Sequence, residues 1–227
     1  MVLSQQRSGQ MSDSFLVMVP LTLSGGLQDA YSYFMRDGVF ANAQTGNIVL
    51  MSHKLFSGDF GGCLRYFIPV LAFALGVWAA DLIRSLRPGG GKVHWRQTVL
   101  AGEILLLAAV GFLPQTWSRL ANALISFSCA MQVESFRSVN GNAYASTMCI
   151  GNLRSGMACL GGAVRNRDPH QLLEAGTYGL VILLFAAGAG VGSVLTRYMG
   201  LRTIWVSCLL LAVSFLCMLA NRSRANT

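Results

Sequence analysis

The stretch GGLQDAYSYFMRDGVFANAQTGNIVLMSH, from Gly25 to His53, decides the fold that the sequence predicts. In this stretch a hydrophobic segment is interrupted by paired glycines and by Asp29. A polar loop follows and leads into a short apolar run that starts at Thr45-Gly46-Asn47. A fainter copy, MQVESFRSVNGNAYASTMCIGNLRSG from Met131 to Gly156, lies in the second half of the chain. The sequence therefore indicates two related units, each with a long apolar segment followed by a short one.

The composition is that of a membrane protein. Apolar side chains make up 53% of the 227 residues and charged ones only 11%, whereas about 25% is usual in soluble domains. The net charge of +8 comes from basic residues that stand at the ends of apolar runs. Contact with anionic headgroups explains this pattern better than nucleic acid does. The six cysteines lack a CxxC spacing, so we expect neither a disulfide framework, nor a zinc site, nor any other cofactor.

The apolar runs predict an all-α, polytopic membrane helix bundle that forms a single integral membrane domain. Runs of roughly 20 residues can cross a bilayer core. We expect six full spans, at about residues 14–34, 64–86, 95–113, 118–136, 172–198 and 201–220. Arg36 and Asp37 are expected to mark an exit to water after the first span.

Two further runs, Thr45–Phe56 and Gly151–Val164, are too short to be ordinary spans. The first would reach roughly 18 Å as a helix, about half of the hydrocarbon core. We expect half-helices or re-entrant segments, or helices packed entirely within the protein.

The distribution of Lys and Arg predicts the topology. With six spans and a cytoplasmic N-terminus, eleven of the 17 basic residues fall on the inner side, among them Arg7, Arg87 and Lys92. If both short runs also crossed, the split would be nine to eight, and the positive-inside rule needs a clear excess. We therefore expect six spans, with both termini in the cytoplasm.

The order of elements predicts an inverted repeat. The halves, about residues 14–113 and 118–220, each contain three full spans, and an odd number makes them face opposite ways, as in many transporters. Asn47 superposes on Asn152 at an offset of 105 residues, which also sets Asp29 against Glu134. Pairing Gln28 with Gln132 requires an offset of 104 instead, so the pairing of the acids stays open.

The segments GGLQDAYSY, TGN, MQVESFR and MCIGNLRS resemble the YoaK-like family of bacterial multi-pass membrane proteins, a domain of unknown function. The resemblance covers nearly the whole chain. It implies a multi-pass protein of the bacterial cell inner membrane and says little about activity. Related second halves often carry an amide after the Gln, where this chain has Val133 and then Glu134.

The starts of the short runs are the main candidate site. A half-helix that begins within the membrane directs free N–H groups and a partial positive charge forward. Two such starts meeting near the midplane would bind an anion or a small neutral solute. In the alternative interpretation, Thr and Asn merely cap the helices. The candidate residues for a solute pathway are Asp29, Thr45, Asn47, Glu103, Glu134 and Asn152.

The three acids among these candidates each allow a structural interpretation as well. Asp29 either faces a cavity or sits at the level of the headgroups. Glu134 and Arg137 are three residues apart and can pair on one helix. Glu103 is the deepest acid, and it either carries a proton or makes a hydrogen bond between helices.

Transport or permeation of a small solute is the function that these features predict. The alternative is a non-transporting membrane scaffold or sensor. We do not expect an enzyme, because the histidines are scattered and HExxH, GxSxG and phosphate-loop motifs are lacking. The expected partners are the lipid bilayer and an unidentified small solute or ion, and a homo-oligomer is compatible with this prediction.

Overall fold

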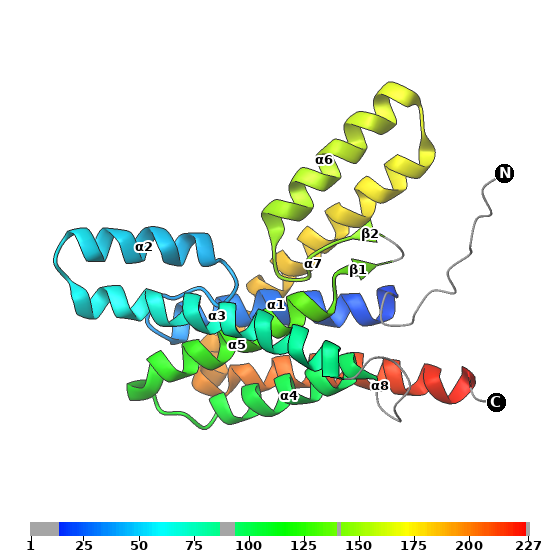
Figure 1. Cartoon of the computed structure of the whole chain (residues 1–227). Coiled ribbons are helices and arrows are strands. Elements are labelled where there is room, and N and C mark those ends of the chain that lie inside the picture. The colour runs from blue at the N-terminus through cyan, green and yellow to red at the C-terminus, as the bar shows by residue number, and fades with distance from the viewer. Residues whose placement is uncertain (1–13, 87–93, 140–141, 226–227) are drawn as a thin grey trace.

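The computed structural model describes residues 14–86, 94–139 and 142–225. Within this part of the chain the elements are helices, apart from a hairpin of two strands, β1 (Ser138–Val139) and β2 (Asn142–Ala143) (Figure 1). The predicted all-α class is therefore confirmed. Arg7, Arg87 and Lys92, with the tail and the turn that contain them, lie outside the described residues. The helices are α1 (Phe15–Met35), α2 (Gln44–Phe56), α3 (Phe60–Leu86), α4 (Trp95–Val110), α5 (Ser118–Ser135), α6 (Cys149–Asn166), α7 (Pro169–Met199) and α8 (Ile204–Ala225), with the 3-10 turns η2 (Gln115–Trp117) and η3 (Gly200–Thr203).

The surface of the long helices suits a lipid environment. Among the described residues, two helical stretches are long and apolar enough to cross a membrane: Phe60–Leu86, which is α3, and Pro169–Ala220, which contains α7, η3 and most of α8. A broad apolar stripe of this kind would promote association in water, and a lipid bilayer would cover it. This supports a helical membrane protein, while the number of six full spans remains a prediction. The exposed apolar side chains on α3 follow helical spacing, at Leu64, Phe67, Leu71, Leu75, Trp78 and Leu82.

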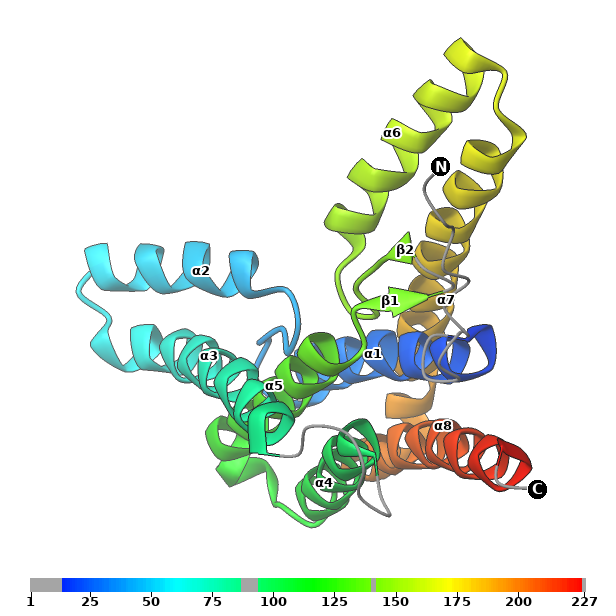
Figure 2. The same ribbon diagram turned by 45° about the vertical axis from the view of Figure 1, so that its right-hand side comes forward.

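The helices pack in two groups, and each group mixes the two halves of the chain. In one group α1 packs against α7 and α8, and α6 lies along α7. In the other group α5 packs against α3 and α4, and α2 lies along α3. The main contact between the groups is that of α4 with α8. Figures 1 and 2 show α2–α3 and α6–α7 as two hairpins that extend in different directions from the crossing of α1 and α5. Helices α1 and α5 are thus exchanged between the halves.

Glycines allow the closest helix crossings. A Cβ atom at Gly188 of α7 would overlap the carbonyl oxygen of Leu23 in α1. In the other group, a Cβ atom at Gly76 of α3 would overlap the carbonyl oxygen of Phe127 in α5. Only a residue without a side chain lets two backbones approach this closely, as small residues do in membrane bundles. The two crossings therefore have the same form.

Arg36 is buried, so the prediction that it marks an exit to water is wrong. The carbonyl groups at the end of an α-helix lack partners within the helix, and the guanidinium offers five N–H donors. Arg36 therefore donates hydrogen bonds to the carbonyl groups at the end of α4. The next residue, Asp37, is exposed, and its φ of +64° turns the chain. The Arg36 side chain donates to Tyr31 Oη at 3.0 Å and to the carbonyl oxygens of Val110 (3.1 Å), Leu113 (2.8 Å) and Pro114 (3.0 Å).

Candidate functional site

The two short helices begin beside the middle of α1. Ahead of α2, the backbone N–H of Asn42 donates to Oδ1 of Asp29 at 2.8 Å, and its Nδ2 donates to the carbonyl oxygen of Gly25 at 3.2 Å. Ahead of α6, a Cβ atom at Gly25 would lie 2.8 Å from Cγ2 of Thr147 and 3.3 Å from the carbonyl oxygen of Ser146. Both starts therefore meet the same residue, Gly25, at the midpoint of α1.

Helix α2 falls well short of the bilayer core, whereas α6 nearly matches it. Helix α2 has 13 residues, which span ~20 Å, against a core of ~30 Å. Helix α6 has 18 residues and spans ~27 Å. It is longer than predicted because it begins at Cys149 and continues to Asn166. In Figure 1, α2 starts level with the middle of α1 and runs toward the side where α1 ends and α3 begins.

Polar side chains gather on one face of α1. Leu21, Gly25 and Asp29 follow at four-residue intervals and therefore share that face. Gln132 of α5 reaches it with Nε2, which donates to the carbonyl oxygen of Leu21 at 3.2 Å and to Oγ of Ser146 at 2.8 Å. We name this region the Gly25 face, which consists of Leu21, Gly25 and Asp29 together with Asn42, Gln132, Ser146 and Thr147.

A second row of polar groups leads away from the Gly25 face. Sγ of Cys129 donates to Oε1 of Gln28 at 2.8 Å, and Nε2 of Gln28 donates to Oγ of Ser24 at 2.9 Å. The preceding residue on α5, Ser128, donates its hydroxyl to Oε1 of Glu103 at 3.3 Å. Because Gln28 and Cys129 lie on the helices that carry Asp29 and Gln132, polar groups continue from the start of α2 across α1 and α5 to α4.

Asn47 and Asn152 close the loops ahead of their own helices. Nδ2 of Asn47 donates to the carbonyl oxygen of Phe40 at 2.7 Å, and its Oδ1 accepts the N–H of Phe40 at 3.3 Å. Asn152 does the same with Ala145, at 2.7 and 3.3 Å. These bonds tie each loop to its helix and are not caps, because the N-cap residues Ala43 and Met148 make no side-chain cap hydrogen bond. Thr45 is exposed on α2 and makes no part of the Gly25 face.

The acids lie at different places. Asp29 is buried in the Gly25 face, and Glu103 is fully buried on α4. Glu103 makes the predicted hydrogen bond between helices, but its Oε2 has no partner among the described residues. Glu134 is paired with Arg137, as their spacing predicts, and stands apart from the other acids.

Several residues of the Gly25 face carry no signal of their own in the sequence. Asn42 stands in a loop of small and polar residues, and Ser146 and Thr147 resemble ordinary turn residues. Gln132 appears in the internal alignment with Gln28, and that alignment is the one clue that could have found it. Among the described residues, no three His, Cys, Asp or Glu side chains gather as a metal site would require.

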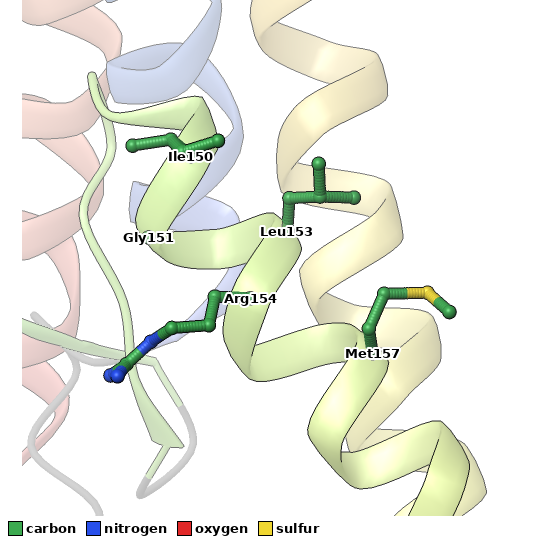
Figure 3. Close-up of a pocket in the computed structure, with 5 residues that line it drawn as sticks. All are labelled: Ile150, Gly151, Leu153, Arg154 and Met157. Atoms are coloured by element: carbon green, nitrogen blue, oxygen red, sulfur yellow. The ribbon is translucent and has the colours of Figure 1, made fainter.

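A hollow of about 580 Å³ on the outer side of α6 lies apart from these groups. In Figure 3, Leu153 and Met157 point to one side of the helix and Arg154 to the other. Ile150, Leu153 and Met157 are exposed and apolar, so the hollow suits a lipid chain better than a polar solute.

Comparison with known proteins gives one match. A family model described as "Protein of unknown function (DUF1275)" matches residues 17–217. The match spans both halves of the chain and agrees with the resemblance seen in its motifs. No curated protein and no solved structure matches the chain.

Proposed function

Because the chain belongs to the DUF1275 family of proteins of unknown function, we propose its function from its own geometry: it is a small-solute transporter or permease of the bacterial inner membrane. The observation that carries this proposal is the meeting of α2 and α6 at Gly25. Half-helices that begin at mid-depth and face each other form the substrate sites of many transporters. The Gly25 face is the central polar site.

The proposed topology has six spans, α1, α3, α4, α5, α7 and α8, with α2 and α6 as half-helices and both termini in the cytoplasm. Figure 1 supports it for five of the six helices, because the beginnings of α1 and α4 and the ends of α3, α5 and α8 lie toward one side of the molecule, while α7 begins at the tip of the α6–α7 hairpin. Six crossings require this alternation. Helices α3 and α7, with 27 and 31 residues, exceed the roughly 20 residues that a span needs, whereas α4 has 16 residues.

The proposed inverted repeat relates α1–α4 to α5–α8. Its support is the matched packing: α1 contacts α7 and α8 as α5 contacts α3 and α4. The two helix groups meet mainly through α4 and α8. Rocking of one group against the other, as in other repeat transporters, would open the Gly25 face first to one side of the membrane and then to the other.

The test is the access of water-soluble reagents to the Gly25 face. Cys129 adjoins this face through Gln28, so a variant that keeps only Cys129 carries a natural probe. Cysteines introduced singly at Asn42 and Thr147 in a cysteine-free chain extend the test. We expect a charged, water-soluble thiol reagent to label these positions in membranes, and a cysteine at the lipid-facing Leu71 to stay unlabelled. Protection of all three central positions would contradict the proposal.

A non-transporting scaffold or sensor is the second candidate. It is favoured by Asn47 and Asn152, whose amides are engaged with their own loops. Solute flux into liposomes separates the candidates, because a scaffold gives none. The Glu103→Gln variant then tests proton coupling: flux driven by a pH gradient is lost if the carboxyl carries the proton, and is kept if Glu103 serves only as a partner of Ser128.

A further inference from the structure

Three buried oxygen atoms around the Gly25 face accept no hydrogen bond within the described part of the chain. They are Oδ1 of Asn42, Oε1 of Gln132 and Oγ1 of Thr147. The exposed fractions of these residues are 3%, 0% and 4%. A buried polar atom without a partner costs roughly 1–3 kcal/mol, and native proteins keep few of them. Three such atoms against one helix face point to a ligand.

The orientation of both amides is fixed by their other bonds. Nδ2 of Asn42 donates to the carbonyl oxygen of Gly25, and Nε2 of Gln132 donates to that of Leu21. A main-chain carbonyl only accepts, so the amide nitrogen must face it in each case. The amide oxygens are therefore left for the ligand, which must supply N–H or O–H donors. The hydroxyl of Thr147 can accept from the same ligand or donate to it.

The charges around the Gly25 face balance when Asp29 is ionised. Each helix start carries roughly half a positive charge, and both α2 and α6 begin here. Oδ1 of Asp29 accepts the N–H of Asn42 directly ahead of α2, and Asp29 in its ionised form supplies one negative charge. A bound anion would be repelled by this carboxylate and by the three oxygens. A bound cation would leave a net buried charge, which is costly in a membrane interior.

We infer that the Gly25 face binds a small neutral solute rich in N–H or O–H donors, of the chemical class of urea, small amides or polyols. This inference names the substrate class of the proposed transport site and so rests on the proposed function. It decides between the anion and the neutral solute that the sequence left open. Oδ1 of Asp29 already accepts the N–H of Asn42 in the loop ahead of α2.

Swelling of liposomes that contain the full chain tests the inference. The probes are urea, acetamide and glycerol as neutral solutes, and chloride and formate as anions, with an ionophore to carry the counter-ion. We expect at least one neutral probe to enter several-fold faster than into protein-free liposomes, and neither anion to do so. Entry of an anion without entry of a neutral probe would overturn the inference and leave transport standing. Entry of none of the five would overturn it too, and protected central cysteines would then contradict the transport proposal as well.

Asp29→Asn tests the charge balance. The amide keeps an oxygen for the N–H of Asn42 but removes the negative charge, so the two helix starts are left uncompensated. We expect chloride or formate entry to rise several-fold. Asp37→Asn makes the same chemical change at an exposed residue outside the Gly25 face and should leave the entry of neutral probes and of anions unchanged. Unaltered anion exclusion in a folded Asp29→Asn protein would overturn the inference.

Gln132→Leu provides a second, independent variant. It removes the unpartnered oxygen and leaves the charges untouched, so entry of the neutral probe should fall several-fold without any gain of anion entry. Unchanged entry of the neutral probe in this variant would show that the oxygen does not contact the solute. That result would overturn the inference even if the Asp29→Asn protein does not fold.

Discussion

Asn47 and Asn152 make the same two hydrogen bonds, although they belong to different helices. Each amide binds both backbone groups of the residue seven positions earlier, Phe40 and Ala145, with matching distances of 2.7 and 3.3 Å. Both pairs keep the offset of 105 residues that the internal alignment predicts. The loops ahead of α2 and α6 are therefore built alike, and this likeness brings both helix starts to Gly25.

We expect Asn47→Ala and Asn152→Ala each to destabilise the protein by about 1–3 kcal/mol, because the backbone groups of Phe40 and Ala145 lose their partners. Thermal unfolding in detergent measures the effect. Thr45→Ala, an exposed change on the same helix as Asn47, should leave the unfolding temperature nearly unchanged. An unchanged unfolding temperature with altered solute flux would instead place Asn47 in the pathway.

The α1–α7 crossing should not tolerate a methyl group on its glycine. In Gly188→Ala the new Cβ would overlap the carbonyl oxygen of Leu23, so the helices must separate, and overpacking of this kind costs roughly 1–3 kcal/mol. Gly190→Ala is the matched control on the same helix, since its Cβ would meet no atom of the described structure within 4 Å. We expect a lower unfolding temperature for Gly188→Ala only. Equal effects would contradict the observed crossing.

Arg36 should resist replacement even by lysine. A lysine ammonium is a compact charge and cannot reproduce the planar fork of N–H donors, so at least one carbonyl group at the end of α4 loses its bond. Each lost bond to a charged group costs roughly 1.5–3 kcal/mol. The unfolding temperature of Arg36→Lys should fall accordingly. Asp37→Asn, on the adjacent exposed residue, should have little effect, and a similar loss there would mean that the turn itself limits stability.

The part of the structure that the sequence predicts is local. Apolar run length gives the helices, and the short runs appear as α2 and α6. The pairing of Glu134 with Arg137 follows from a spacing of three residues on a helix. Each of these inferences needs only neighbours along the chain.

The part that the sequence does not predict depends on contacts between distant segments. Arg36 reads as a surface charge because the carbonyl groups it binds lie on α4. Gln132 reads as an ordinary helix residue because its partners are Leu21 and Ser146. An internal repeat shows which elements correspond, but not that α1 and α5 change places between the halves. Hydropathy cannot supply this information, because it shows which face of a helix is apolar and not which helix covers it.

The turns of the two hairpins should weaken at acidic pH. Asp59 lies between α2 and α3, where the N–H of Gly62 (2.8 Å) and the ammonium of Lys54 (3.0 Å) hold its pKa below the usual 3.8. Asp168 lies between α6 and α7, where Nε2 of Gln171 and the N–H of His170, both at 2.9 Å, lower its pKa in the same way. Because the folded-state pKa lies below the unfolded-state value, the ionised carboxylates favour the folded turns above the unfolded-state pKa. This contribution is lost as the pH falls through the folded-state pKa.

The measurement is the difference in unfolding temperature between the wild type and the Asp59→Asn, Asp168→Asn double variant as a function of pH. We expect the wild type to be more stable near neutral pH, and the difference to shrink once the pH falls below about 4, where both carboxyl groups take up protons. Asp37→Asn removes an exposed carboxylate outside both hairpins and serves as the control. A difference that stays constant at acidic pH would show that the turns need the hydrogen-bonding shape of the side chain and not its charge.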